Sequence, residues 1–269
     1  MVQNIGRGAL NGGSGVQYFI GDFDGKNFTN DNTPETILWF DHGTDNYAGV
    51  TWSGLPNGRI VNIGWLSNWD DYAQSVPTGS WRSANTIPRE LTLVKTKEGY
   101  RMLQLPVKEL ELIVNPGEKR RNGETEKRKT DFEYQGKLIC KVELIMDLSA
   151  SASEFSIELK NDLNEKLIIG FDKANNNVFV DRTKSGKTDF SKKFAAIHHA
   201  NYTFSNQLNV LLLLDETSME LFLDDGKLAM TELFFPNQPY NQIQLMDKNH
   251  SVEKVNGGVY PVKAIFSNR

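Results

Sequence analysis

Helical periodicity is scarce in this chain, and this constrains its fold more than any other feature. Short runs rich in Val, Ile, Phe, Tyr and Thr recur about every 8–15 residues, with Gly, Asn and Asp turns between them. This pattern is typical of an all-β protein. The first group of predicted strands is QYFI (17–20), TILWF (36–40), YAGVTW (47–52), RIVNIGWL (59–66) and RELTLV (89–94).

A second group of predicted strands fills the C-terminal part. Met219, Leu221 and Leu223 alternate with Glu220 and Phe222, which predicts a sheet with one face on a core. Asn-Gly at 57–58 and Asp-Asp-Gly at 224–226 predict tight hairpin turns. The strands of this group are LICKVELIMDL (138–148), EFSIELK (154–160), KLIIGFD (166–172), NVFVDR (177–182), NQLNVLLLLD (206–215), SMELFLDDGKLAMTELFF (218–235) and VYPVKAIF (259–266).

Between the two groups lies the charged stretch EKRRNGETEKRKTD (118–131), which holds no apolar residue. Three glutamates interleave with its basic residues, so it favours a solvated loop or linker over a nucleic-acid-binding arm. Together with Pro106 just upstream, it predicts an aromatic-rich N-terminal part over 1–106 and a β-sandwich over 107–269.

The bulk properties exclude several classes of partner. A net charge of −4 argues against a nucleic-acid partner. The longest apolar run is about LNVLLLL (208–214), far short of the roughly 20 residues that span a membrane. We recognise no signal peptide in this chain and leave its compartment open. Cys140 is the single cysteine, and its apolar surroundings predict a buried, inert thiol.

All five tryptophans fall within residues 39–81, where short carboxylates and amides interleave with them. Tryptophan offers a large apolar face that stacks on a sugar ring, and Asp or Asn beside it can bind the hydroxyl groups. For any single tryptophan, packing in the core is the ordinary alternative. Taken together, the cluster favours a carbohydrate site.

Two other patterns fail on spacing. GDFDGKNF (21–28) lacks the spacing of a phosphate loop and the glycine and glutamate of a calcium loop, so it predicts a turn. The four histidines show no metal-ligand spacing, and the adjacent pair His198 and His199 would point to opposite faces of a strand. We expect neither a metal nor a cofactor.

Four motifs, read in order, identify a family. The chain contains NGGSGVQYFIGDFDGKNF, DHGTDNYAGVTW, GRIVNIGWLSNW and TIPRELTL, followed by FVDRTKSGKTDFSKKF (179–194) and LLLLDETSMELFLDDGKLAMTELFFP (211–236). In this order they resemble glycoside hydrolase family 32, the levanases, exo-inulinases and invertases, and the levanase or exo-inulinase branch looks nearest. The resemblance implies the last blade or blades of a five-bladed β-propeller, followed by a β-sandwich. It also implies a fructan or another fructose-containing oligosaccharide as the partner.

The chain departs from the family pattern in its catalytic motifs. Members carry a nucleophile segment, an Arg-Asp-Pro motif and a Glu-Cys motif with the general acid/base. Here no Asp precedes any of the nine prolines, and Cys140 follows Ile139. The expectation is therefore the C-terminal portion of a β-fructofuranosidase that is inactive alone, with no catalytic residue assigned.

The resemblance also names candidate site residues. Asp41, Asp45 and Tyr47 belong to a loop at the rim of the sugar pocket, and Trp65 is the aromatic floor or wall for the fructosyl ring. The alternative is that Trp65 packs between blades. Retaining hydrolysis needs two carboxyl groups about 5–5.5 Å apart, and spacing alone leaves Asp41 and Asp45 open as such a pair. Nothing in the sequence sets their pKa values apart, as an acid and a nucleophile require.

Three interpretations remain open. The first, which we favour, is a truncated family member without hydrolysis of its own. The second is a fructan-binding or assembly module. The third is one subunit of a split hydrolase, completed by a partner chain that carries the first blades. Because a partial propeller leaves open strand edges, we also expect a homo-oligomer or association with the N-terminal half of the same enzyme.

Overall fold

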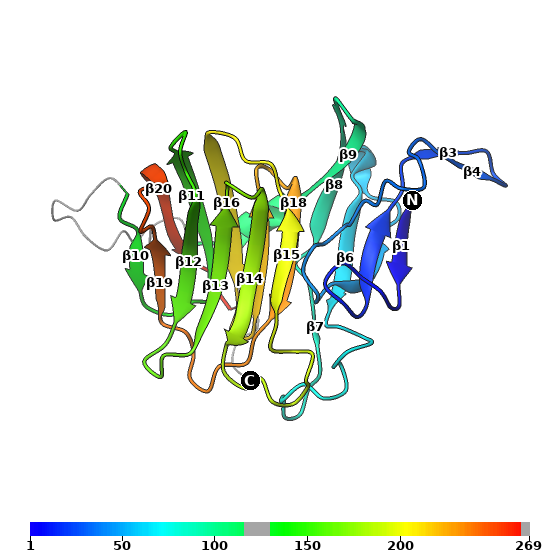
Figure 1. Ribbon diagram of the computed structural model, residues 1–269. Coiled ribbons are helices and arrows are strands. Elements are labelled where there is room, and N and C mark those ends of the chain that lie inside the picture. The colour runs from blue at the N-terminus through cyan, green and yellow to red at the C-terminus, as the bar shows by residue number, and fades with distance from the viewer. Residues whose placement is uncertain (116–129, 265–269) are drawn as a thin grey trace.

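The computed structural model describes residues 1–115 and 130–264, and most of the regular structure in them is β-strand (Figure 1). The charged segment predicted over 118–131 therefore lies outside the described residues, apart from its last two positions. The elements are β1 (Val2–Ile5), β2 (Gly15–Tyr18), β3 (Gly21–Phe23), β4 (Phe28–Asn30), β5 (Tyr47–Thr51), η1 (Pro56–Gly58), β6 (Val61–Leu66), β7 (Ala84–Asn85), β8 (Arg89–Thr96), β9 (Gly99–Pro106), η2 (Lys108–Leu112), β10 (Glu133–Gln135), β11 (Cys140–Leu148), β12 (Glu154–Lys160), β13 (Lys166–Asp172), β14 (Asn177–Lys184), β15 (Ile197–Asn201), β16 (Gln207–Leu214), β17 (Ser218–Leu223), β18 (Leu228–Leu233), β19 (Gln242–Met246) and β20 (Val252–Pro261).

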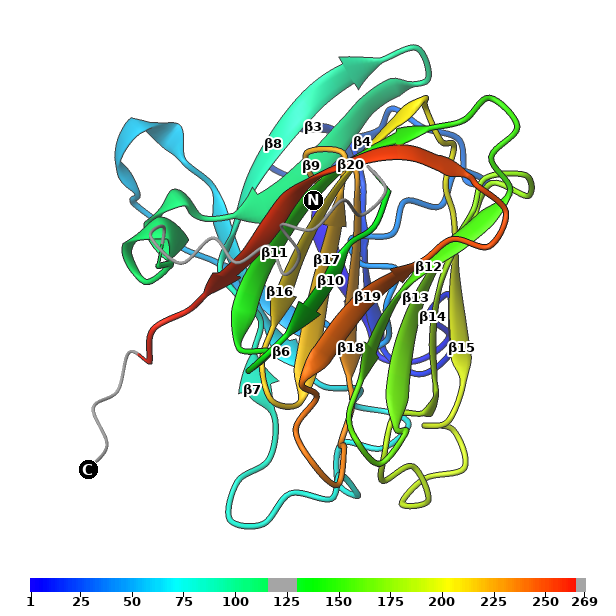
Figure 2. The same ribbon diagram turned by 90° about the vertical axis from the view of Figure 1, so that its left-hand side faces the viewer.

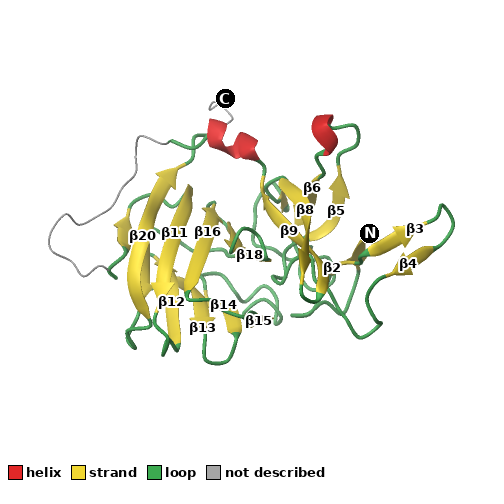
Figure 3. Ribbon diagram, turned by 90° about the horizontal axis from the view of Figure 1, so that it is seen from above, coloured by secondary structure: helices red, strands yellow, loops and turns green. Residues whose placement is uncertain are grey.

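Strands β10–β20 form a sandwich of two antiparallel sheets. The six-stranded sheet has the order β10-β19-β12-β13-β14-β15, and the five-stranded sheet has the order β18-β17-β16-β11-β20. Alternate side chains from both sheets meet between them, among them Val142, Ile157, Ile169 and Leu212, each fully buried. The prediction of a C-terminal sandwich is thus confirmed (Figure 3).

The N-terminal strands form a smaller set of sheets beside the sandwich (Figure 1). Strands β5, β6, β8 and β9 pair in that order, with the short β7 added beside β6. A four-stranded antiparallel sheet of this kind is the form of one propeller blade. Strand β2 contributes Val16 and Tyr18 to a separate apolar cluster with Ile20 and Phe40.

The two parts pack through an apolar cluster of their own. Tyr72 and Val76 from the N-terminal part contact Phe194 and Phe235 from the sandwich side. Strands β17 and β18 are consequently buried on both faces, because the N-terminal part covers the outer face of the five-stranded sheet at these two strands. Met219, Leu221 and Leu223 lie in the sandwich core as predicted, and Glu220 and Phe222 on the opposite face are only 6% and 1% exposed.

Other predictions have mixed outcomes. TILWF (36–40) forms no strand and makes only an isolated bridge from Trp39 to Gln17, because the chain leaves β2 there and turns toward β18. His198 is buried and His199 exposed, so they point to opposite faces as expected. Cys140 is fully buried, and burial raises the pKa of its thiol to about 12.

The predicted turns are also present. In GDFDGKNF, Asp24 Oδ1 accepts hydrogen bonds from the backbone N–H groups of Lys26 and Asn27, both at 2.7 Å, between β3 and β4. No helix within residues 1–115 or 130–264 is both long and apolar enough to cross a membrane.

Candidate functional site

The aromatic residues that the sequence singled out meet on the N-terminal sheet. Trp65 on β6 lies directly opposite Tyr47 on β5 in the strand register. Such cross-strand partners place their side chains on the same face of the sheet. Trp69 follows in the loop after β6, with its ring centroid 6.0 Å from that of Trp65. Trp69 is 57% exposed, so the group opens to solvent rather than lying in a core.

A buried amide connects the loops around this aromatic group. Asn68 Oδ1 accepts hydrogen bonds from the backbone N–H groups of Ser14 and Asp71, and Asn68 Nδ2 donates to the carbonyl of Thr44. Gly13 has φ of +64°, and a Cβ there would lie 2.2 Å from Asn68 Oδ1, so only glycine fits. Three motifs far apart in the sequence are thus held together, although local pattern gave no indication of it.

Asp41 lies in the interface with the sandwich rather than at the surface. Its side chain is 2% exposed and accepts hydrogen bonds from Arg89 Nη1 at 2.9 Å and Thr231 Oγ1 at 2.6 Å. Burial alone would raise the pKa of Asp41, but the charge of Arg89 and several hydrogen bonds hold it below the ordinary value. Arg89 also forms an ion pair with Glu220 at 2.7 Å, and therefore neutralises two buried carboxylates.

Asp45 lies in a second ion cluster of the same interface. Its fully buried carboxylate accepts hydrogen bonds from Arg182 Nη1 at 2.8 Å and from the Tyr72 hydroxyl at 2.7 Å. Arg182 Nη1 also lies 3.1 Å from Glu232, whose other oxygen is 2.9 Å from His198 Nδ1. Burial, together with the like charge of Glu232, raises the pKa of Asp45 above its ordinary value despite Arg182.

The loop that carries both aspartates runs along the edge of β18. The backbone N–H groups of Thr231 and Leu233 donate to Asp41 and Asp45 respectively, each at 2.9 Å. In return, the N–H of Asp45 donates to the carbonyl of Thr231 at 3.1 Å. Gly43 lies between them, and a Cβ there would be 2.2 Å from the Thr231 carbonyl oxygen, so a side chain would force the loop off the strand.

The structure therefore brings Tyr47 and Trp65 together and places Asp41 and Asp45 elsewhere. Both carboxylates are saturated by protein donors, and a sugar could contact either one only if the interface opened. Their pKa values are shifted in opposite directions, which the sequence did not indicate. The cause is long-range packing against two arginines, which no local spacing reveals.

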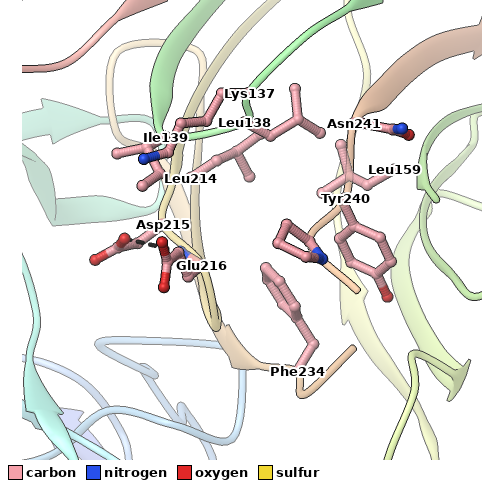
Figure 4. Close-up of a pocket in the computed structure, with 11 residues that line it drawn as sticks. Lys137, Leu138, Ile139, Leu159, Leu214, Asp215, Glu216, Phe234, Tyr240 and Asn241 are labelled. Atoms are coloured by element: carbon pink, nitrogen blue, oxygen red, sulfur yellow. Dashed lines mark hydrogen bonds between the residues drawn. The ribbon is translucent and has the colours of Figure 1, made fainter. Parts of the chain in front are cut away.

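A separate cavity of about 310 Å³ lies at one end of the sandwich, between the two sheets (Figure 4). Its wall is mainly apolar, with Leu138, Leu214 and the neighbouring rings of Phe234 and Tyr240. None of the site residues predicted from the sequence lines it. Within the part of the chain that the structure describes, no three His, Cys, Asp or Glu side chains gather into a metal-binding group.

Comparison with known proteins places this arrangement in a family. The family model for the glycosyl hydrolases family 32 N-terminal domain matches residues 1–106, and the model for the family 32 C terminal matches residues 109–260. The chain belongs to glycoside hydrolase family 32. Family 32 relatives include the levanase of Bacillus subtilis (strain 168), 36% identical over 99% of this chain and 40% of the levanase.

The extracellular exo-inulinase of Aspergillus awamori is another family 32 relative, 31% identical over 95% of this chain and 49% of that enzyme. Its crystal structure superposes with a TM-score of 0.86, covering 98% of this chain and 53% of the exo-inulinase. The fold is accordingly the terminal part of a β-propeller followed by a β-sandwich, as predicted. The chain spans about half the length of the exo-inulinase, and less of the levanase.

Replacing Arg182 by Met is expected to destabilise the chain strongly. The substitution would leave Asp45 and Glu232 buried without a counter-charge, and breaking a buried pair costs about 3–5 kcal/mol. Urea unfolding followed by tryptophan fluorescence measures the change. The matched control is Arg7→Met, because Arg7 pairs with Asp70 at the surface with 83% of its side chain exposed. Equal stability of the two variants would contradict the interface role of Arg182.

The two aspartates are expected to give opposite pH dependences of stability. Asp41 has a folded-state pKa below the ordinary value of 3.8, so its contribution is present above that value and is lost as the pH falls through the folded-state pKa. Asp45 has a folded-state pKa above 3.8, so its contribution is present at low pH and is lost as the pH rises through the raised pKa.

Urea unfolding of wild type, Asp41→Asn and Asp45→Asn between about pH 3 and about pH 8 checks this expectation. The free energy of unfolding of wild type minus that of Asp41→Asn should grow with rising pH. The corresponding difference for Asp45→Asn should shrink. If both differences in the free energy of unfolding changed in the same direction with pH, the two carboxylates would not lie in the environments described.

Proposed function

We propose that the chain is the C-terminal portion of a β-fructofuranosidase-type hydrolase of the levan, inulin and sucrose class, and that it does not hydrolyse these substrates alone. Membership of family 32 and relatives named levanase and exo-inulinase support the substrate class. A further structural relative, the fructofuranosidase of Schwanniomyces occidentalis, is complexed with fructosylnystose. It is 26% identical, with a TM-score of 0.78 over 98% of this chain and 56% of that enzyme.

The observation that carries the lack of activity is the placement of Asp41 and Asp45. Retaining hydrolysis requires one carboxylate free to attack the anomeric carbon and one acid free to protonate the leaving oxygen. Both aspartates are instead held by buried arginines and by hydrogen bonds from β18. The three catalytic motifs expected of a family member are also missing from the printed sequence.

In this proposal Trp65 and Tyr47 contact the sugar, and Asp41 and Asp45 hold the interface that positions them. The shared face of Trp65 and Tyr47, next to the exposed Trp69, offers stacking area for one ring. One stacked ring with a few hydrogen bonds gives affinity on the order of millimolar, about −4 kcal/mol.

An exposed apolar face favours a second role, that of a subunit in a larger hydrolase. In the proposed partial propeller (1–106), Ile60, Leu93 and Tyr100 are 52%, 54% and 45% exposed. They line a cavity of about 510 Å³ in this part of the molecule. Large exposed apolar patches mark interaction surfaces. We infer that this face takes further strands, supplied by the N-terminal half of such an enzyme or by a second copy of the chain, while 107–269 forms the sandwich module.

Binding of a fructan oligosaccharide is expected to depend on Trp65. Titration of the chain with a levan or inulin oligosaccharide should change the tryptophan fluorescence with a midpoint in the millimolar range, on the order of 1 mM or more. Trp65→Ala should abolish this response. Trp81→Ala is the matched control, because Trp81 is 48% exposed and has no ring partner in the group. A response that survives in Trp65→Ala would place the fluorescent site elsewhere.

The chain alone is expected to release no fructose from levan, inulin or sucrose above a blank without protein. A positioned general acid–base group is worth only roughly 10²–10⁴-fold, which cannot replace the missing nucleophile. Release that appears on adding a separately expressed N-terminal half would support the split-enzyme role. Turnover by the chain alone that Asp41→Asn or Asp45→Asn removes would overturn the proposal.

A further inference from the structure

The outer face of the five-stranded sheet is only half covered by the N-terminal part. Strands β17 and β18 are buried beneath it, whereas Glu143 and Ile145 on β11 remain exposed. A groove of about 600 Å³ lies at the edge of the N-terminal part, between the exposed face of β11 and Leu105 on β9. Figure 2 shows the β8–β9 hairpin beside the part of the sheet made by β20, β11 and β16.

The strand register arranges the outward positions in and beside the groove in three rows. One row crosses β16, β11 and β20 as Asn209, Ile145 and Asn256, and the next as Leu211, Glu143 and Gly258. The third row is Leu213, Lys141 and Tyr260. Gly258 has no side chain, so none projects from β20 between Asn256 and Tyr260, the outward-facing residues on either side of it.

Several polar side chains of this groove have no hydrogen-bond partner among the described residues. Among the described residues, the side chains of Asn209, Asn256 and Asp225 and the hydroxyl of Tyr260 make no hydrogen bond. Each of them lines the groove. Unlike the saturated carboxylates of Asp41 and Asp45, they are free to bind a solute.

The walls of the groove are held in place. The N–H of Gln104 on β9 donates to the carbonyl of Gly226 at 3.1 Å, which fixes the turn carrying Asp225 against the N-terminal part. Gly226 has φ of +83°, and a Cβ there would lie 2.1 Å from the Gln104 carbonyl oxygen. On the other side, the ammonium of Lys141 lies 5.4 Å from the centroid of the Tyr260 ring and braces it.

The lining of the groove includes the carboxylates of Glu143 and Asp225 and no lysine or arginine, so its charges disfavour an anion. Lys141, whose ammonium lies beside the Tyr260 ring, is already paired with Glu111 at 2.7 Å and Glu143 at 3.1 Å, so an anion gains nothing there. The phenol ring of Tyr260 can instead stack on a sugar ring, and two amides and the Asp225 carboxylate can bind its hydroxyl groups. The volume lies within the range of about 300–1,000 Å³ that is usual for small-ligand sites.

We propose that this groove binds a neutral oligosaccharide segment of a β-fructan, as a second site that shares no residue with the Trp65–Tyr47 pair. The proposal rests on the proposed function for the choice of fructan over other neutral sugars. It places Tyr260 as the stacking platform and Asn209 and Asn256 as the amides that bind hydroxyl groups along the chain.

Isothermal titration of the full chain with levan and inulin oligosaccharides tests the groove. Asn256→Ala and Tyr260→Ala should each weaken binding roughly tenfold, and Asn209→Leu, which is nearly isosteric, should do the same without disturbing the sheet. Lys254→Ala is the matched control, because Lys254 lies on β20 two residues from Asn256 and outside the groove. Binding in Trp65→Ala should persist, because the groove does not include Trp65.

The outcomes separate the groove from the proposed function. Binding that Trp65→Ala abolishes, and that all three groove variants leave unchanged, overturns the groove and leaves the proposed function standing. Equal binding of a dextran oligosaccharide overturns the assignment to fructan. Absence of fructan binding by the wild-type chain overturns both proposals.

Discussion

The arrangement of the two parts depends on how one sheet edge is satisfied. Strand β18 ends the five-stranded sheet, and an edge strand presents backbone N–H and C=O groups without partners. The loop from Asp41 to Asp45 supplies these partners, using two carboxylates where a neighbouring strand would use carbonyls. Burying two negative charges is unfavourable unless each is paired, and Arg89 and Arg182 provide that pairing.

This edge contact also sets the position of the aromatic pair. Asp45 is followed after one residue by Tyr47, the first residue of β5, which lies opposite Trp65. Asp45, just before β5, accepts a hydrogen bond from β18, and Asn68, just after β6, donates one to the Thr44 carbonyl. One end of each strand that carries the aromatic pair is therefore fixed by a hydrogen bond. The candidate sugar site is therefore built on the interface even though the aspartates do not face it.

The sequence pattern predicted strands and turns, which depend on neighbouring residues, and missed contacts between residues far apart in the chain. The bounds predicted for β12 and β13 agree with the structure, because uninterrupted alternation or apolar content defines these strands within seven residues. The Asp-Asp-Gly hairpin is also local, and Asp224 and Asp225 indeed have positive φ. Asp41, in contrast, bonds Thr231 across 190 residues. The local sequence of a polar loop does not show whether its carboxylate binds a sugar or pairs with a distant arginine.

The same docking that buries the aspartates creates the groove on the sandwich. The contact between Gln104 and Gly226 brings β9 against the β17–β18 turn, so β17 and β18 are covered while β11, β16 and β20 stay open beside it. The groove and the aromatic pair thus share one structural support without sharing residues. A variant that loosens the interface, such as Arg182→Met, would disturb both sites together, whereas a change at Tyr260 or Trp65 would act on one. The number of sites that a substitution affects therefore distinguishes a residue that binds ligand from one that only fixes the two parts against each other.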